Sequence, residues 1–194
     1  MFEFLLQADK HLFYLINRTL ANPVFDVVMP FVTTEEHFVI PLILLWLGLL
    51  LFGGRRERIA ALLILPTLLL SDQLSSSILK PLVGRIRPCN ALPDVRLLDR
   101  CTHSFSFPSS HATNIFAAAG LLSGFYRKYR GYFYGIAVLV AYSRPYVGVH
   151  YPSDVLFGAW LGWMCGWAVL SGYRALSRRY PVISLTGEEK NKGG

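Results

Sequence analysis

The chain has 194 residues, of which 53% are apolar, and its mean hydropathy is +0.40. This length suits one domain, and the apolar content exceeds that of an ordinary soluble domain. The chain carries 19 Lys and Arg against 12 Asp and Glu, but its cations lie in short clusters between apolar runs. This pattern disfavours nucleic-acid binding and favours a membrane protein whose partners are anionic lipids or phosphate.

The first 34 residues are apolar but repeatedly interrupted. Asp9, Lys10, Arg18 and Asp26 divide the apolar stretches, and two prolines break them. Residues 1–34 are therefore predicted to form amphipathic helices that lie in the membrane interface, with a further transmembrane span as the lesser possibility.

Five apolar segments follow, each able to cross a bilayer core if flanking side chains reach the interface. They are Phe38–Gly53, Ile59–Leu79, Ala112–Tyr126, Tyr132–Tyr142 with its flanks, and Val155–Tyr173. The sequence predicts an all-α, integral-membrane helical bundle with about five to six transmembrane helices. Its transmembrane core is expected to occupy residues 38–174.

Basic clusters follow the first, third and fifth of these segments, at residues 55–58, 127–130 and 174–179. Short loops rich in Lys and Arg stay on the cytoplasmic side of a membrane. We therefore expect a protein of the cell (inner) membrane whose C-terminus, including the polar tail at 185–194, is cytoplasmic. The loops 80–111 and 144–154 are then expected to face the periplasm or the cell exterior.

These outward loops contain three stretches suited to handling phosphate. The first, K-P-L-V-G-R-I-R-P at residues 80–88, places Lys80 and Arg87 two helical turns apart. A helix would direct both cations the same way, although Gly84 and the prolines interrupt it. By itself the stretch is more typical of a basic patch that touches lipid headgroups, which is the role expected of Arg85.

The second stretch, P-S-S-H at residues 108–111, precedes a run of small residues that predicts a helix. The hydroxyls of Ser109 and Ser110, with the unpaired backbone N–H groups of a helix start, can cradle an anion. His111 would lie at the rim, where an imidazolium can give a proton to a departing alkoxide. A helix N-cap followed by an interfacial histidine explains Ser-Ser-His equally well.

The third stretch, S-R-P-Y-V-G-V-H-Y-P-S-D, occupies residues 143–154. His150 and Asp154 lie one helical turn apart, and Pro152 predicts a helix start between them. The carboxylate can hold the imidazole in one tautomer, which makes His150 a candidate nucleophile toward phosphorus. The guanidinium of Arg144 can donate two parallel hydrogen bonds to phosphate oxygens. A single His–Asp pair is usually structural, so the argument depends on all three stretches meeting.

In order and spacing, the three stretches resemble the signature of type 2 phosphatidic acid phosphatases. This PAP2 superfamily of membrane lipid phosphatases is related to vanadium haloperoxidases. The family pattern is K-x6-R-P, then P-S-G-H, then S-R-x5-H-x3-D, and residues 80–154 match it with one departure. Ser110 stands where the family usually has Gly, so the backbone there is less free to adopt positive φ. The resemblance implies one PAP2-like membrane domain over residues 1–194.

The resemblance also implies a function: hydrolysis of a lipid phosphate or pyrophosphate at the outer membrane face. The lipid could be an isoprenoid pyrophosphate, a glycerolipid phosphate or a lipid A phosphate. His150 would form a phosphohistidine, Asp154 would orient it, and His111 would protonate the leaving group. The implied phosphate ligands are Lys80, Arg87, Ser109, Ser110 and Arg144. Because fixed cations can replace a metal ion in phosphoryl transfer, neither a metal nor another cofactor is expected.

Two other functions fit parts of this pattern. A lipid phosphotransferase would use the same phosphohistidine and pass the group to a second lipid. A non-catalytic anion channel or lipid-binding protein would use the cations only to attract phosphate, and it would have no use for an oriented His150–Asp154 pair. Neither the identity of the lipid nor the oligomeric state can be read from the sequence.

Five further residues carry predictions. Asp72, inside the second apolar segment, is expected to be a packing partner that faces the bundle. Cys89 and Cys101 lie on the outward loop, where they either form a disulfide that ties this loop down or remain free thiols. Cys165 is expected to be buried, and His103 to be solvated.

Overall fold

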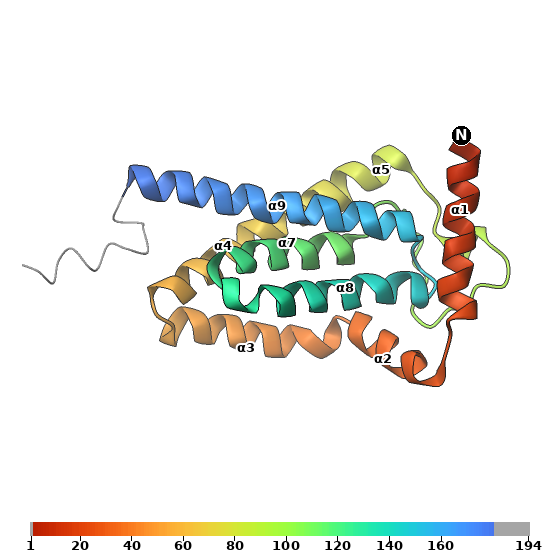
Figure 1. Ribbon diagram of the computed structural model, residues 1–194, viewed down its shortest axis with the longest axis horizontal. Coiled ribbons are helices and arrows are strands. Elements are labelled where there is room, and N and C mark those ends of the chain that lie inside the picture. The colour runs from red at the N-terminus through yellow and green to blue at the C-terminus, as the bar shows by residue number, and fades with distance from the viewer. Residues whose placement is uncertain (1, 181–194) are drawn as a thin grey trace, which may run out of the picture.

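The computed structural model describes residues 2–180, so the predicted cytoplasmic tail at 185–194 lies outside the described residues. Every regular element within residues 2–180 is helical, as the sequence predicts. Figure 1 shows an elongated bundle in which most long helices run along its length, while α1 (Phe2–Tyr14) crosses one end. The candidate site residues belong to elements that meet at this same end.

The N-terminal part consists of three helices with short breaks. A π-helical turn, Leu15–Thr19, connects α1 to α2 (Pro23–Thr33). Asn22 caps α2, because its side chain accepts a hydrogen bond from the backbone N of Phe25 at 3.0 Å. A bend of 50° then separates α2 from α3 (Glu36–Phe52).

The next helix is long but ends abruptly at the site. From α4 (Arg55–Asp72) the chain continues through a π-helical segment, Gln73–Leu79, into the short α5 (Lys80–Val83). Gly84 stops the helix, since its φ of +63° lies in the left-handed region that favours glycine. A loop containing the one-turn helix α6 (Pro88–Ala91) leads on to α7.

The last three helices complete the bundle. They are α7 (Ser110–Phe125), α8 (Arg130–Tyr146) and α9 (Pro152–Arg179), with a 3₁₀ turn at Arg127–Tyr129 between the first two. Of these, α7 is central and packs against α4, α8 and α9. The loop that joins α8 to α9 contains His150 and lies at the same end as α1 (Figure 1).

Close packing between α7 and α9 depends on glycines that recur at every fourth position of α9. They are Gly158, Gly162 and Gly166. A Cβ on Gly158 would lie only 2.7 Å from the carbonyl oxygen of Ser109, and a Cβ on Gly162 would collide with the carbonyl oxygen of Thr113. Small residues at this spacing allow two helix backbones to approach closely. The starts of α7 and α9 are thereby held side by side.

Two of the described helical stretches are long and apolar enough to cross a membrane: Arg55–Ala91 and α9. The bent pair of α2 and α3 would add a third if it acts as one broken span. The five apolar segments predicted from the sequence coincide with α3, α4 with its π-helical extension, α7, α8 and α9. Because α7 and α8 have only 16 and 17 residues, the number of five to six transmembrane helices stays a prediction.

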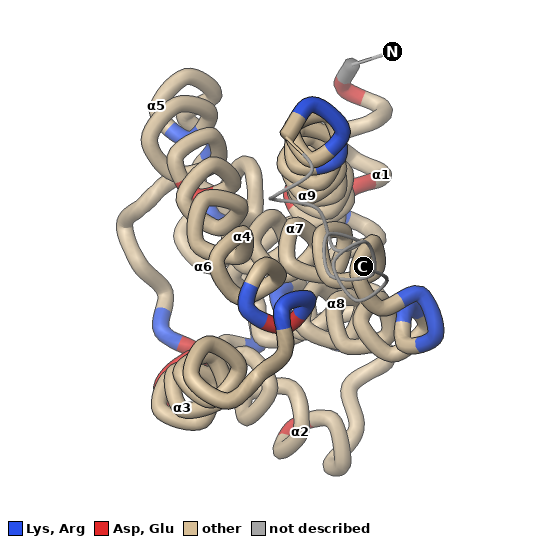
Figure 2. The backbone as a smooth tube through the Cα atoms, turned by 90° about the vertical axis from the view of Figure 1, so that its left-hand side faces the viewer, with Lys and Arg blue, Asp and Glu red and all other residues tan. Residues whose placement is uncertain are grey.

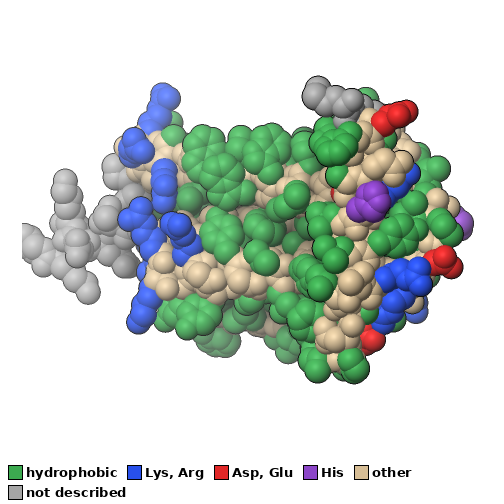
Figure 3. All heavy atoms as spheres, turned by 45° about the vertical axis from the view of Figure 1, so that its right-hand side comes forward, with side chains coloured by type: hydrophobic (Ala, Val, Ile, Leu, Met, Phe, Trp, Pro, Cys, Tyr) green, Lys and Arg blue, Asp and Glu red, His purple; other side chains and the backbone are tan. Residues whose placement is uncertain are grey.

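The three basic clusters gather at the end of the bundle opposite α1. Figure 2 shows Lys and Arg where α4 begins, where α8 begins and where α9 ends. Figure 3 shows these cations at one end and hydrophobic side chains over the middle of the visible face. The separation of the basic end from the candidate site thus agrees with the sequence analysis. The membrane side that each end faces stays a prediction.

Candidate active site

His150 is buried in the loop between α8 and α9, with an exposed fraction of 1%. Its Nδ1 lies 3.5 Å from Oδ2 of Asp154, and its Nε2 lies 3.1 Å from Nη1 of Arg87. A guanidinium can only donate, so Nε2 accepts and the ring proton belongs on Nδ1, facing the carboxylate. Burial lowers the pKa of His150 to about 3, which leaves the ring neutral. A neutral imidazole with its lone pair on Nε2 is the form that a nucleophile requires.

Asp154 is fully buried in the first turn of α9 and is held by several donors. Its Oδ2 accepts hydrogen bonds from the backbone N of Tyr151 at 2.9 Å and from the hydroxyl of Ser106. Its Oδ1 accepts one from Nη1 of Arg85 at 2.6 Å. The carboxylate therefore has a fixed position from which it can orient His150.

The structure corrects the prediction for Arg85, which was expected to touch lipid headgroups. Its guanidinium instead bridges Asp9 of α1 and Asp154, at 2.6 Å from each carboxylate. It also lies over the ring of Tyr151, 3.8 Å from the ring centroid. The prediction assumed that a helix continues past residue 83, whereas Gly84 turns the chain and directs Arg85 inward.

Arg87 is buried and its guanidinium is almost fully engaged. Nε and Nη2 donate to the carbonyl oxygen and the hydroxyl of Ser104, each at 2.9 Å. Nη1 donates to the carbonyl oxygen of Val149 at 3.1 Å as well as to His150. These bonds orient the guanidinium so that Nη1 lies next to Nε2 of His150, the atom that would attack phosphorus.

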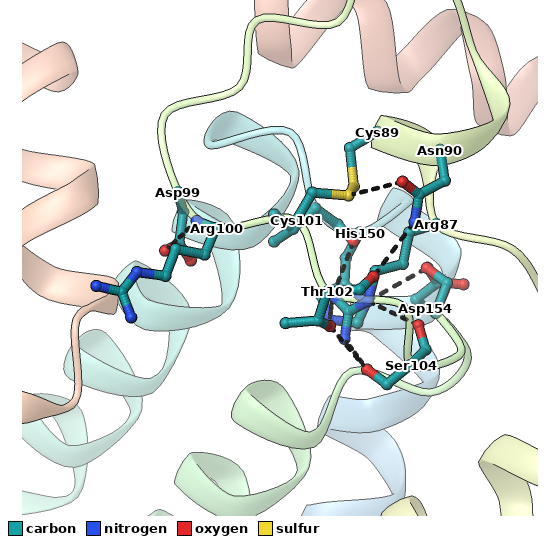
Figure 4. The surroundings of a disulfide bond; sticks show 12 residues. Arg87, Cys89, Asn90, Asp99, Arg100, Cys101, Thr102, Ser104, His150 and Asp154 are labelled. Atoms are coloured by element: carbon teal, nitrogen blue, oxygen red, sulfur yellow. Dashed lines mark hydrogen bonds and ion pairs between the residues drawn. A yellow bond between two sulfur atoms is a disulfide. The ribbon is translucent and has the colours of Figure 1, made fainter.

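A disulfide between Cys89 and Cys101 anchors the loop that carries these ligands, with their Cα atoms 6.2 Å apart. The structure thus favours the disulfide over the free thiols that the sequence left open. Figure 4 shows the disulfide next to Arg87, Ser104 and His150. Cys165 is a buried free thiol, as predicted.

Arg144, at the end of α8, is buried and only partly satisfied. Its Nη1 donates to Oδ2 of Asp99 at 3.0 Å and to the hydroxyl of Thr33. Its Nε is buried and has no hydrogen-bond partner among the described residues. Leaving a buried charged donor unpaired is costly, and a phosphate oxygen would satisfy it. Among residues 2–180, this unpaired buried donor is a feature of the site that indicates an anionic ligand.

His111 lies in the first turn of α7, where its Nε2 is 2.9 Å from Oε1 of Glu35. Glu35 lies at the bend between α2 and α3, and its side chain is 70% exposed. The start of α7 is also tied to that of α9, because the backbone N of Ser109 donates to the carbonyl oxygen of Asp154 at 3.1 Å. His111 and the His150–Asp154 pair therefore belong to elements joined at the same end of the bundle.

The two predicted serine ligands are occupied by structural contacts. Ser109 is fully buried and caps α7, since its side chain accepts a hydrogen bond from the backbone N of Ala112. The hydroxyl of Ser110 lies 2.9 Å from that of Ser76 in the π-helical segment. The N-cap reading of this stretch is therefore right, and the predicted cradle of free hydroxyls stays a proposal.

Lys80 lies close enough to Arg87, Arg144 and Asp72 for its charge to interact with theirs. Asp72 accepts hydrogen bonds from the hydroxyl of Ser76 at 3.1 Å and from the side-chain amide of Asn114 at 3.5 Å. Asp72 is thus a packing partner that faces the bundle, as predicted. Its negative charge also helps to offset that of Lys80.

The sequence analysis missed the groups that hold the catalytic candidates in place. They are Asp9, Glu35, Arg85, Asp99, Ser104 and Ser106. These residues lie far along the chain from their partners, so no spacing rule connects them. A signal existed for Glu35, because it precedes an apolar segment at the end where the site was expected. Within residues 2–180, no group of three or more His, Cys, Asp or Glu side chains is arranged to hold a metal ion.

A helical bundle with a buried imidazole–carboxylate pair among fixed cations is the arrangement that a membrane phosphatase would need. The sequence pattern of the PAP2 superfamily matches residues 61–178. The chain belongs to this superfamily, which confirms the resemblance seen in its three motifs.

Three known proteins are similar to this chain over most of its length. The lipid A 4'-phosphatase of Bacteroides thetaiotaomicron is 34% identical over 178 residues, an alignment that covers 86% of this chain and 77% of that protein. The crystal structure of Aquifex aeolicus LpxE superposes with a TM-score of 0.65 and a sequence identity of 31%. The match covers 83% of this chain and 93% of the LpxE chain. The PAP2-type phosphatidylglycerolphosphate phosphatase of Bacillus subtilis is 29% identical, with a TM-score of 0.70 and coverages of 91% and 89%.

Proposed function

We propose that the protein hydrolyses the phosphate of a membrane lipid through a phosphohistidine on His150. The observation that carries this proposal is the neutral, buried imidazole held between the carboxylate of Asp154 and the guanidinium of Arg87. Lipid A phosphate is the first substrate to test, because a lipid A 4'-phosphatase aligns with 86% of this chain. Glycerolipid phosphates and isoprenoid pyrophosphates follow.

In the first step, the lone pair on Nε2 of His150 attacks phosphorus and the bond from phosphorus to the lipid oxygen breaks. His111 gives its proton to the departing oxygen, and Asp154 balances the positive charge that forms on the phosphorylated ring. The hydrogen bond from Arg87 to Nε2 is exchanged for one to a phosphate oxygen. Arg144, through its unpaired Nε, and Lys80 stabilise the charge on the other oxygens.

In the second step, the neutral His111 takes a proton from water as the water oxygen attacks phosphorus. The nitrogen–phosphorus bond breaks, its electron pair returns to Nε2 of His150, and inorganic phosphate leaves. His111 is again protonated, so the cycle consumes one water and releases one phosphate and one lipid alcohol. Each group has then returned to its initial state.

We further propose that the site faces the periplasm or the cell exterior, with the basic end in the cytoplasm. The support is the concentration of Lys and Arg at the end of the bundle opposite His150 (Figure 2), since such loops are retained in the cytoplasm. The site would then act on lipids of the outward-facing leaflet.

The test uses the purified protein in detergent with a panel of lipid phosphates and pyrophosphates, scored by release of inorganic phosphate. His150→Ala is expected to lower turnover on the order of 10⁴-fold or more, while His103→Ala, an exposed histidine of the same loop region, should match the wild type. We expect activity to persist in EDTA. Equal turnover by His150→Ala and the wild type would refute the mechanism. Phosphate transfer to a second lipid, without release of free phosphate, would instead identify a phosphotransferase.

A further inference from the structure

A groove of about 680 Å³ lies between α7, α8 and α9, away from the candidate active site. None of the catalytic candidates lines it. Its walls are of two kinds, aromatic toward the middle of the bundle and cationic toward the basic end. The aromatic wall is formed by Phe116, Tyr134, Trp160 and Trp163.

The aromatic part of the groove faces the surroundings of the bundle. Trp160 and Trp163 of α9 are 54% and 43% exposed. Phe116 and Tyr134 pair across α7 and α8, with ring centroids 6.1 Å apart. Large exposed rings at mid-bundle depth suit contact with an acyl chain.

The cationic part consists of three arginines from three different elements: Arg127, Arg130 and Arg174. All three are exposed, and none of them takes part in the ion pairs found among residues 2–180. Their charges are therefore available to an anion. The guanidinium group suits a phosphate in particular, because its fork of N–H donors matches two phosphate oxygens.

A second, independent feature also indicates a ligand. Ser123 lines the groove, is only 7% exposed, and its hydroxyl has no hydrogen-bond partner among the described residues. Leaving a buried hydroxyl unpaired is unfavourable. A rotation about the Cα–Cβ bond of Ser123 would bring this hydroxyl to an oxygen atom of a molecule bound in the groove.

The length of the groove fits one lipid. Trp160 and Arg174 lie fourteen residues apart on α9, a rise of about 21 Å at 1.5 Å per residue. One leaflet of a bilayer contributes about 15 Å of hydrocarbon, with the headgroup region beyond it. The distance from Trp160 to Arg174 therefore matches that from the end of an acyl chain, near the bilayer midplane, to the phosphate of a phospholipid.

We propose that this groove binds one anionic phospholipid from the leaflet that surrounds the basic end. The phosphate lies among the three arginines, the glycerol region lies at Ser123, and one acyl chain runs along the aromatic wall. This lipid is not the substrate, because the groove lies toward the end of the bundle opposite His150. The proposal does not depend on the hydrolysis proposed above.

The test is native mass spectrometry of the full chain in detergent, titrated with phosphatidylglycerol and, separately, with phosphatidylcholine. We expect one phosphatidylglycerol to bind at least tenfold more tightly than phosphatidylcholine. Direct contact with the lipid phosphate is expected to give each groove arginine roughly a fivefold gain in affinity, which a cation outside the groove does not share. The triple variant Arg127→Gln, Arg130→Gln, Arg174→Gln should therefore bind phosphatidylglycerol on the order of 100-fold more weakly.

A matched control removes three charges from the same end without touching the groove: Lys128→Gln, Arg178→Gln, Arg179→Gln. Its affinity should stay within about threefold of the wild type. Ser123→Ala should bind more weakly and should raise the melting temperature of the lipid-free protein, since it removes an unpaired buried hydroxyl. A cooperative thermal unfolding transition shows that each variant is folded.

Three outcomes would overturn the proposal. Equal losses in both triple variants would show attraction to surface charge alone. Displacement of the lipid by inorganic phosphate at constant ionic strength would show a site for a small anion. Loss of a dimer, rather than of a bound lipid, in the groove variant would show that a second copy of the chain occupies the groove.

Discussion

Both ring nitrogens of His150 are engaged before a substrate binds. Nδ1 faces Asp154, and Nε2 accepts a hydrogen bond from Arg87 at 3.1 Å. The nucleophilic atom is thus masked by the cation that phosphate would attract. In the proposed mechanism Arg87 first donates to Nε2 of His150 and then to a phosphate oxygen. Nε2 becomes free to attack when Arg87 changes partner.

The lowered pKa of His150 predicts a dependence of stability on pH. The ordinary pKa of 6.5 falls to about 3 in the folded protein because the ring is buried. Between these values the unfolded chain binds a proton that the folded protein does not. The contribution of His150 to stability is therefore full above pH 6.5 and is lost as the pH falls toward 3. Melting temperature measured from pH 7 to pH 4 should fall more steeply for the wild type than for His150→Asn.

His103→Asn serves as the control for this experiment, since His103 is exposed. Its melting curve should follow that of the wild type at every pH. Parallel curves for His150→Asn and the wild type would contradict the assignment of a buried, neutral His150.

At the residue scale, spacing within the chain was sufficient to select the candidate catalytic groups. His150 and Asp154 are one turn apart, and α9 starts between them as Pro152 predicts. Arg85 was misassigned because its direction depends on a left-handed Gly84, and the sequence does not reveal where a helix containing glycine will end. Glu35 was missed because its partner His111 lies on a distant segment.

At the scale of elements, α1 acts as a brace for the start of α9. Asp9 accepts hydrogen bonds from the backbone N of Ser153 at 2.9 Å and from Arg85 at 2.6 Å. Arg85 in turn holds Asp154. The N-terminal helix α1 is therefore connected to the carboxylate of Asp154 through one guanidinium.

We expect Asp9→Asn to weaken these contacts and to cost about 1.5–3 kcal/mol of stability, the range for hydrogen bonds to charged groups. The value of kcat should fall about tenfold while KM changes little, because no proposed phosphate ligand is altered. Steady-state kinetics and thermal unfolding test this. Asp94→Asn, at an exposed loop position, is the control. A change in KM alone would show that Asp9 affects substrate binding instead.

The disulfide gives a second prediction for the loop before α7. It closes a loop with a sequence separation of 12, for which chain entropy predicts a stabilisation of about 3 kcal/mol. The double variant Cys89→Ser, Cys101→Ser should melt at a lower temperature. It should also turn over more slowly, because Ser104 and Ser106 hold Arg87 and Asp154.

Mass spectrometry after alkylation, with and without reductant, counts the thiols in the native protein. Cys165→Ala is the control, since this thiol is not part of the disulfide. Full activity and unchanged stability in the double serine variant would show that the loop needs no covalent anchor.

Helix positions were predictable from hydropathy, whereas their breaks were not. Each of the five apolar segments became a helix within a few residues of its expected bounds. The bend at residue 34 and the π-helical segment before Lys80 have no hydropathy signal, because they depend on hydrogen bonds between neighbouring elements. The position of Lys80 depends on that segment.

At the scale of the whole molecule, the candidate catalytic groups come together because the glycines in the first half of α9 let this helix pack closely against the backbone of α7. Gly162→Ala would place a Cβ against the carbonyl oxygen of Thr113. We expect a loss of about 1–3 kcal/mol of stability, as for other overpacked cores, and a lower kcat, because His111 and Asp154 would separate. Thermal unfolding and turnover are the measurements.

Gly172→Ala is the matched control on the same helix, because a Cβ there would meet nothing within 4 Å. It should be as stable as the wild type or slightly more so, since Ala favours a helix over Gly. Equal behaviour of the two variants would show that the glycines of α9 do not set the distance between the helices.

The sequence predicted that the basic clusters and the candidate site lie at opposite ends of the molecule, but it did not predict how the helices pack. Loop charge was enough to separate the basic end from the site, because each cluster follows alternate apolar segments. The four-residue repeat of glycines in α9 was a readable signal for close packing, which the sequence analysis did not use. Contacts such as Asp9 with Ser153, separated by 144 positions, arise only when the helices are assembled.

The candidate active site carries its own counter-ions. Glu35 faces His111, Asp99 faces Arg144, and both acids are partly or largely exposed. A phosphate group that binds as proposed would therefore have to replace these two carboxylates as the partner of His111 and Arg144. A lipid can drive this exchange with the binding energy of its tail, whereas free inorganic phosphate has no such energy to contribute. Return of the two carboxylates after cleavage would then help to expel the product, so weak product inhibition follows from the same ion pairs.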